Sequence, residues 1–195
     1  VVFVLMLTIS PLPASGLYAM VSFVWLLLFV WVLAYPRFAN VWRQQTLLLS
    51  LFGILILVTA WKSLSELQAA ESGAGYILYF WCLIAMADSA AYFTGRKWGK
   101  NKLAPQLSPG KTWQGVYGAL VSACLVSIFG AWLFGFPAGF AYAFVGLGLL
   151  TVVTSIFGDL TESMLKREAG VKDSGQLIPG HGGMLDRIDS MLAAA

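Results

Sequence analysis

The sequence predicts an all-α, polytopic transmembrane helical bundle with about five complete spans. Of the 195 residues, 59% are hydrophobic and only 11% are charged. Soluble domains carry roughly 25% charged residues, and a chain with so many apolar side chains would not stay solvated as a disordered polymer. The apolar residues also fall in blocks of roughly 16 to 22, each long enough to cross a hydrocarbon core of about 30 Å. We therefore expect an integral membrane protein.

The apolar blocks give the spans in order. Pro36 and Arg37 close the first, and the second is short enough to need snorkelling of Arg43 and Lys62 at its ends. Trp and Tyr gather near several span ends, as they do in interfacial belts. The predicted spans are Leu17–Tyr35, Thr46–Trp61, Tyr76–Thr94, Trp113–Phe134 and Ala138–Phe157.

The chain shows no internal repeat and no low-complexity linker, so we expect residues 1–195 to form a single transmembrane domain. It opens at Val1 inside an apolar run and stops at Ala195 as another run begins. We therefore expect a fragment, truncated at both termini, with partial helices at both ends.

The cations predict the orientation of the chain. Five alternating spans put eleven of the twelve Lys and Arg residues on one side and only Lys62 on the other. Cytoplasmic loops are enriched in Lys and Arg, so the basic side should be cytoplasmic, with a bacterial inner membrane as the expected compartment. The net charge of +3 is too small to indicate nucleic-acid binding. The polar, Gly-rich segments 95–112 and 158–189 then share the cytoplasmic face, where we expect the chemistry.

The segment 95–112 has the composition of a phosphate cradle. Glycines alternate with its five cations, and Ser108 and Pro109 precede Gly110, Lys111 and Thr112. Glycine lets backbone N–H groups approach an oxyanion, and Lys with a hydroxyl completes the site. The segment is not a P-loop, because Pro105 stands where that motif needs Gly. The alternative is that its charge only retains the loop inside or binds anionic lipid.

The acidic residues point to a cation site. Asp88 falls in the middle third of an apolar span, where a carboxylate costs several kcal/mol unless it faces a polar cavity or a partner. Asp159 and Glu162 have i, i+3 spacing at the end of the fifth span, and Asp186 and Asp189 repeat it. Hard oxygen ligands beside many cations suggest a divalent ion that bridges phosphates. The alternative is simple ion pairing, for example of Asp186 with Arg187.

His181, the only histidine, lies among glycines, where contact with a phosphate or a ribose is expected. From Ser163 to Asp189 the chain resembles the signature of the phosphatidate cytidylyltransferases (CDP-diacylglycerol synthases), and the block from Asp88 to Thr112 looks like the upstream motif of that family. Gln114 stands where many relatives carry Glu.

The resemblance implies a polytopic, dimeric enzyme that joins CTP and phosphatidic acid, giving CDP-diacylglycerol and pyrophosphate. It implies that Asp159, Asp186 and Asp189 hold the metal, with Mg²⁺ the expected ion and K⁺ as a further ion beside it. Lys166 and Arg187 join these aspartates as expected catalytic residues. The expected substrate-binding residues are Asp88, Arg96, Ser108, Lys111, Thr112, Arg167, Lys172, His181, Gly182 and Gly183.

Two other functions remain open on the sequence. A CTP-dependent polyprenol or dolichol kinase also brings CTP to a membrane lipid, although the complete motif from His181 to Asp189 favours the cytidylyltransferase. An ion or proton transporter could use Asp88 and Asp159 as relay sites within the membrane. Nearly all candidate acids cluster on one side of the membrane, and this argues against a transporter.

Overall fold

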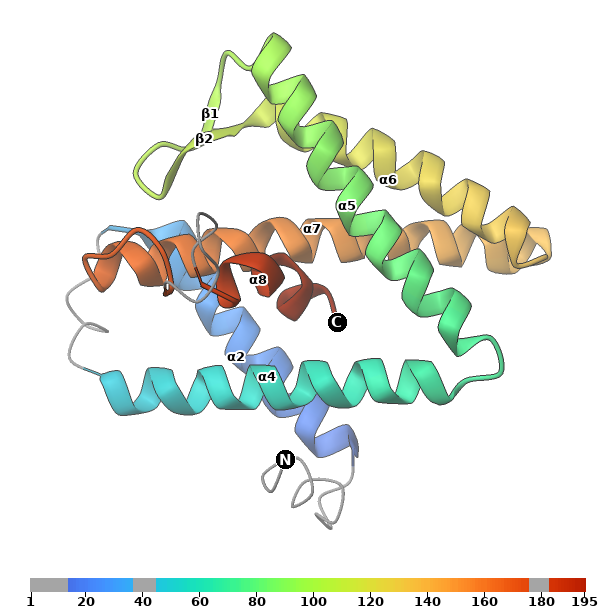
Figure 1. Cartoon of the computed structure of the whole chain (residues 1–195), viewed down its shortest axis with the longest axis horizontal. Helices are drawn as coiled ribbons and strands as arrows, with labels where there is room; N and C mark the ends of the chain where they lie inside the picture. Colours follow the sequence, from blue (N-terminus) through green and yellow to red (C-terminus); the bar gives the residue numbers. More distant parts are fainter. Residues whose placement is uncertain (1–13, 37–44, 176–182) are drawn as a thin grey trace.

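The structure, a computed structural model, describes residues 14–36, 45–175 and 183–195. The partial helix expected at the start of the chain lies outside these residues. The described elements are α2 (Ala14–Ala34), α4 (Thr46–Ala69), α5 (Gly73–Trp98), β1 (Lys102–Ala104), β2 (Ser108–Thr112), α6 (Trp113–Leu133), α7 (Ala138–Glu168) and α8 (Leu185–Ala194) (Figure 1). Within the described residues, five helices are long and apolar enough to cross a membrane. The predicted helical, integral membrane protein is confirmed.

Three spans are clearly longer than the sequence predicted. Helix α5 begins at Gly73, before Tyr76, and continues past Thr94 to Trp98. Helix α4 continues past Trp61 to Ala69, so Lys62 is not at its end but pairs with Glu66 one turn further on, at 3.2 Å. Helix α7 continues past Phe157 to Glu168. Hydropathy places the end of a span where the apolar run ends, but a helix continues as long as its polar side chains find partners. The extension of α7 carries Asp159, Glu162 and Lys166.

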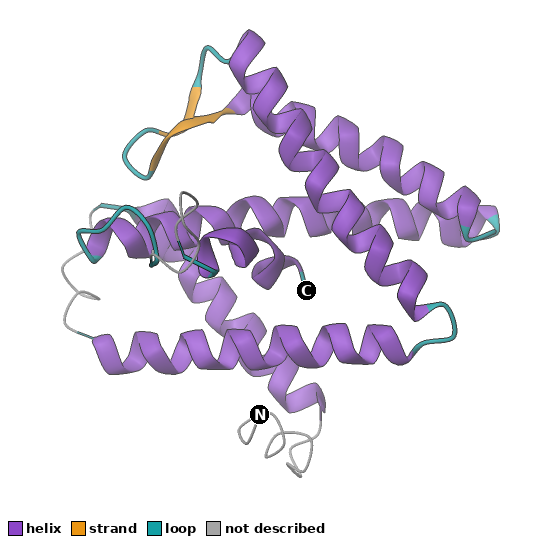
Figure 2. Ribbon diagram, viewed as in Figure 1, coloured by secondary structure: helices purple, strands orange, loops and turns teal. Residues whose placement is uncertain are grey.

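A small antiparallel sheet interrupts the otherwise helical chain between α5 and α6 (Figure 2). Lys102 pairs with Thr112 and Ala104 with Ser108, and Trp113 N donates to Asn101 O at 3.0 Å. This hairpin has no clear signal in the sequence, because its strands are short, polar and contain proline and glycine. The hairpin carries much of the segment predicted to bind phosphate.

The turns sort to opposite ends of the bundle. The α4–α5 and α6–α7 turns lie together at the right of Figure 1, and the start of α4, the end of α7 and the hairpin lie toward the left. The segments expected to share one face, 95–112 and the described part of 158–189, are therefore on the same side of the molecule. The short helix α8 lies against α7.

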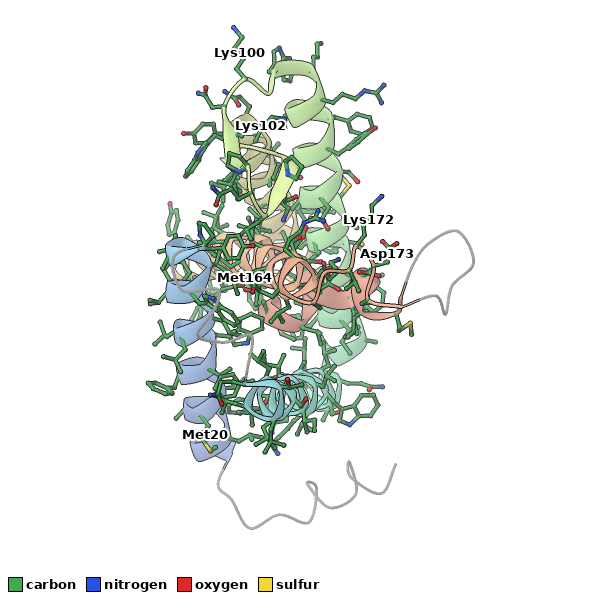
Figure 3. All side chains as sticks on the ribbon, turned by 90° about the vertical axis from the view of Figure 1, so that its left-hand side faces the viewer. Met20, Lys100, Lys102, Met164, Lys172 and Asp173 are labelled. Atoms are coloured by element: carbon green, nitrogen blue, oxygen red, sulfur yellow. The ribbon has the colours of Figure 1, made fainter. Side chains whose placement is uncertain are left out.

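Two apolar clusters hold the helices together. One joins α2 to α7 and to the hairpin through Leu28, Leu107 and the fully buried Met164 (Figure 3). The other joins α5, α6 and α7, with Ala87, Ala119, Ala123 and Val152 buried. Small side chains let helix backbones approach closely in a membrane, where the association of helices depends on packing.

The contact between α7 and α8 depends on Gly158. A Cβ at this position would lie 2.6 Å from the Cβ of Ala193 and 2.7 Å from the backbone oxygen of Asp189. Both distances are shorter than real contacts, so no larger residue fits without moving α8. The glycine thus brings the helix that carries Asp186 and Asp189 directly onto the helix that carries Asp159.

We predict that Gly158→Ala lowers the midpoint of thermal unfolding in detergent, because overpacking typically costs about 1–3 kcal/mol. The matched control is Gly146→Ala on the same helix, where an added Cβ meets nothing within 4 Å. Alanine is the better helix former, so the control variant should be neutral or slightly stabilised. Equal midpoints for the two variants would contradict the packing argument.

Candidate functional site

A polar cavity of 680 Å³ opens between α5, the hairpin, α6 and α7. Among the residues that line it, six were predicted from the sequence to serve a site. They come from separate elements, and only the fold brings them together. These six are Asp88, Arg96, Ser108, Lys111, Thr112 and Asp159.

Helical spacing places the α5 and α7 side chains. Asp88, Tyr92 and Arg96 follow one another at intervals of four, so they share one face of α5. Arg96 Nη1 donates to the Tyr92 hydroxyl at 2.8 Å, which fixes the guanidinium beside this face. Ser155 and Asp159 have the same spacing on α7. Asp88 thus lines a polar cavity instead of facing only the acyl chains of the bilayer. This accounts for a carboxylate at that depth.

The hairpin and α7 are joined across the cavity by a close ion pair. Lys111 Nζ lies 2.6 Å from Asp159 Oδ2, and Ser163 Oγ donates to Asp159 Oδ1 at 3.3 Å. The Asp159 side chain keeps 37% of its surface exposed, so an incoming group can still reach it. An ammonium and two carboxylates in one cavity can receive a molecule that carries both phosphate charge and a bound cation.

Thr112 has a structural contact that the sequence did not predict. It is 4% exposed, and its hydroxyl accepts a hydrogen bond from Gly115 N at 3.1 Å, which caps the start of α6. Gly95 and Gly99 pack against it: a Cβ on either would lie within 3.0 Å of the Thr112 side chain. These two glycines therefore accommodate Thr112, whereas Gly110, with nothing within 4 Å, is open to a ligand.

A second polar cluster lies where α7 meets α8. Lys166 Nζ is 2.5 Å from Glu162 Oε2 and 2.7 Å from Asp186 Oδ1. The other oxygen of Asp186 accepts hydrogen bonds from Ser174 N at 2.9 Å, Ser174 Oγ at 3.0 Å and Gly183 N at 2.7 Å. Asp186 therefore ties Ser174, which follows α7, and Gly183, which precedes α8, to Lys166. The side chain of Arg187, considered from the sequence as a partner of Asp186, lies outside the described residues.

The contacts of Asp186 change its protonation. Burial opposes ionisation, but the Lys166 ammonium and the hydrogen bonds from Ser174 and Gly183 outweigh it and hold the pKa of Asp186 well below its usual range. Asp189 is the opposite case. Its burial and the negative charge of Asp159 raise its pKa, although Ser190 N donates to it at 2.7 Å. The negative charge of Asp186 is thus stabilised by its partners, whereas burial and the charge of Asp159 oppose ionisation of Asp189.

The predicted metal ligands can be tested against this geometry. Within the described ranges, no group of three or more His, Cys, Asp or Glu side chains is arranged to hold a metal ion. Asp159 and Asp189 nevertheless act on each other electrostatically, and the Glu162 side chain interacts with Asp189 as well as with Lys166. Mg²⁺ typically takes one or two carboxylates and completes its octahedron with substrate oxygens and water. Asp159 lines the polar cavity, Asp189 lines a separate cavity of 150 Å³ together with Glu162, and Asp186 faces Lys166. Asp159 and Asp189 are each a carboxylate of the kind that Mg²⁺ accepts, but the three predicted ligands do not line one cavity.

The other residues predicted to bind substrate do not line the polar cavity or lie outside the described residues. Arg167 Nε donates to Leu107 O at 3.4 Å and so ties α7 to the hairpin. Lys172 is exposed in the turn after α7 (Figure 3). His181 and Gly182 lie outside the described residues, and only the backbone of Arg187 is described.

Several side chains of this region were absent from the predicted site. Tyr92 and Ser155 line the cavity, and Ser174 holds Asp186. The spacing of four from Asp88 and from Asp159 could have indicated the first two, but no sequence signal marks Ser174. Gln114 Oε1 accepts from Lys100 N at 3.2 Å and Asn101 N at 3.3 Å, so this residue holds the turn before the hairpin.

Comparison with known proteins identifies the family. A model described as the cytidylyltransferase family matches residues 1–195. The chain belongs to the cytidylyltransferase family. Its relatives include a Haemophilus influenzae protein named phosphatidate cytidylyltransferase, 45% identical over 179 residues, which cover 87% of this chain and 62% of that protein. A Pseudomonas aeruginosa protein of the same name is 43% identical over 194 residues, 98% of this chain and 71% of that protein.

A Bacillus subtilis phosphatidate cytidylyltransferase is 46% identical over 125 residues, 63% of this chain and 45% of the relative. The chain thus spans about three-fifths of the Haemophilus relative, since the alignment covers 62% of that protein. Membership of the cytidylyltransferase family agrees with the resemblance read from residues 163–189.

We predict that Lys166→Met loosens the loop between α7 and α8 and raises amide hydrogen exchange in peptides covering residues 171–175 and 183–190. Removing one member of a fully buried ion pair costs about 3–5 kcal/mol, and less is expected here because Lys166 and Asp186 keep 20% and 11% exposure. Lys172→Met, at an exposed position, is the control. If the two variants exchanged alike, Lys166 would not hold the loop.

Proposed function

We propose that this member of the cytidylyltransferase family carries the catalytic domain of a phosphatidate cytidylyltransferase. It would transfer the cytidylyl group of CTP to phosphatidic acid and give CDP-diacylglycerol and pyrophosphate. The observation that carries the proposal is the polar cavity, in which Asp88, Lys111 and Asp159 meet among membrane-spanning helices. The names of the relatives support the same reaction.

The reaction needs two anions to be brought together. A phosphate oxygen of phosphatidic acid attacks the α-phosphorus of CTP, the new P–O bond forms as the bond to the leaving oxygen breaks, and pyrophosphate departs with the electron pair. Phosphatidic acid is already anionic near neutral pH, so no strong general base is required. Catalysis is then mainly positioning and neutralisation of charge.

The residues divide this work. Arg96, Lys102 and Lys111 line the cavity and would neutralise phosphate charge. Ser108 and the open backbone at Gly110 would add neutral donors. Further candidates for substrate binding are Arg167, Lys172, His181, Gly182, Gly183 and Arg187. Lys166 and Asp186 would act by holding α8 and the preceding loop in place.

Mg²⁺ is part of the proposal. Asp159 and Asp189 would hold it, and when bound it would supply positive charge that offsets the negative charge of the phosphate groups. We extend the proposal to K⁺ as a further ion beside it. We keep Asp186 in the proposed metal site with Asp159 and Asp189, with the role of positioning α8.

We further propose that the cavity opens to the cytoplasm of a bacterial inner membrane and that the protein is a homodimer. The basic residues support this orientation, because Arg96, Lys97, Lys100, Lys102 and Lys111 gather at the hairpin end of the bundle. CTP is a cytoplasmic nucleotide, so the cavity would be reached from the side that holds the substrate.

We predict that Asp159→Asn lowers turnover by about 10²-fold or more, because the variant loses a charge at the reacting centre. Pyrophosphate release from CTP is measured in vesicles with and without phosphatidic acid. Glu71→Gln is the matched control, since it makes the same change at an exposed position in the α4–α5 turn. Release of CDP instead of pyrophosphate would identify a lipid kinase and overturn the proposed reaction.

We also predict a divalent-ion requirement that depends on the α8 carboxylate. Chelation should abolish turnover and added Mg²⁺ should restore it, and Asp189→Asn should raise the Mg²⁺ concentration needed for half-maximal turnover. Binding of Mn²⁺, followed by electron paramagnetic resonance, gives a readout without turnover. Unchanged Mn²⁺ binding in both Asp159→Asn and Asp189→Asn would remove these residues from the metal site.

A further inference from the structure

A second cavity of 570 Å³ adjoins the polar one and has a different chemistry. The end of α2, the hairpin, α6 and α7 all contribute to it. No Asp, Glu, Lys or Arg is among the described residues that line it, and Gln106 is the one amide. Its volume is within the range of about 300–1,000 Å³ typical of ligand sites.

The two cavities share a wall. Leu103, Val116 and Ile156 line both of them. A molecule with a polar and an apolar end could therefore lie across these three residues, with its charged end beside Lys111 and Asp159 and its other end in the apolar cavity.

Helix α7 separates the two chemistries by helical spacing. Ser155 and Asp159 face the polar cavity, and Val153, Phe157 and Leu160 face the apolar one. Each set repeats at intervals of three or four, so each occupies its own side of the helix. Ile156 lies between the two sides and lines both cavities.

The hairpin makes the same division along its length. Lys102, Ser108 and Lys111 face the polar cavity, while the turn from Ala104 to Leu107 faces the apolar one. Leu107 is 3% exposed, and its backbone oxygen accepts a hydrogen bond from Arg167. The hairpin is thus fixed against α7 with one end in each cavity.

We propose that the apolar cavity receives one acyl chain of the lipid phosphate substrate while the phosphate of the same molecule occupies the polar cavity. This inference rests on the proposed function. An acyl chain in a bilayer is already out of water, so the cavity adds little hydrophobic driving force. Its contribution is orientation: holding the chain fixes the depth and direction of the phosphate beside Lys111.

The test uses phosphatidic acid that carries a photoactivatable diazirine on one acyl chain, in phosphatidylcholine vesicles that contain the full chain. After illumination, mass spectrometry locates the label. We expect it to concentrate in peptides covering residues 103–107 and 153–160. Val153→Phe, which extends a larger side chain into the cavity, should lower the label there several-fold.

Two variants accompany this measurement. Ala104→Phe narrows the cavity from the hairpin side, so the inference stays testable if Val153→Phe does not fold. Val30→Phe is the matched control, because Val30 lies on α2 with 61% of its surface exposed and is not among the residues that line the cavity. Labelling that neither filling variant changes would overturn the inference.

Phosphatidylcholine with the same diazirine separates the substrate from bulk lipid. It should label the exposed helix faces without concentrating in the two peptides. Its zwitterionic headgroup lacks the net negative charge of the phosphate monoester that suits the polar cavity. Equal labelling by both lipids would mean that any bilayer chain enters, and this outcome also overturns the inference. Turnover with CTP is measured in parallel: its absence would count against the proposed function, while the labelling still decides the position of the chain.

Discussion

Charged side chains at the edge of a membrane must find partners, and in this protein α7 carries most of that constraint. The helix leaves its apolar run at Phe157 and continues to Glu168 with Asp159, Glu162 and Lys166 along it. Asp159 meets Lys111 from the hairpin, and Lys166 lies between Glu162 and Asp186. The hairpin and α8 are therefore held to the same helix by charge, and the polar cavity forms where the hairpin and α7 meet α5 and α6.

Close packing makes these charge contacts possible. Gly158 lies between Phe157 and Asp159 and allows α8 to rest on α7, so the carboxylates of Asp159 and Asp189 influence each other. The two acids respond differently to burial because their partners differ. Asp186 has an ammonium and backbone donors, whereas Asp189 has the charge of Asp159 nearby. Asp186 is thus committed to Lys166, Ser174 and Gly183.

The hairpin links the two cavities. One end of this short sheet is charged and the other is apolar. Lys102 and Lys111 line the polar cavity, and Ala104 and Leu107 line the apolar one. Its backbone is fixed by strand pairing and by Arg167, and Gln114 fixes the turn that precedes it. A substrate with a charged head and an apolar tail is the class of molecule that suits such an arrangement.

The sequence by itself determined the fold class, the number of spans, and the residues that carry charge at one end of the bundle. Burial of apolar side chains in lipid needs little information beyond the length and order of the apolar runs, so Trp113–Phe134 was predicted within one residue of α6. The family was also indicated by the sequence, through the fixed spacing between Ser163 and Asp189. The extent of α7, the hairpin and the partners of each acid were decided only by the tertiary structure. An ion pair such as Lys111 with Asp159 joins residues far apart in the chain, and no local pattern encodes which cation a carboxylate meets.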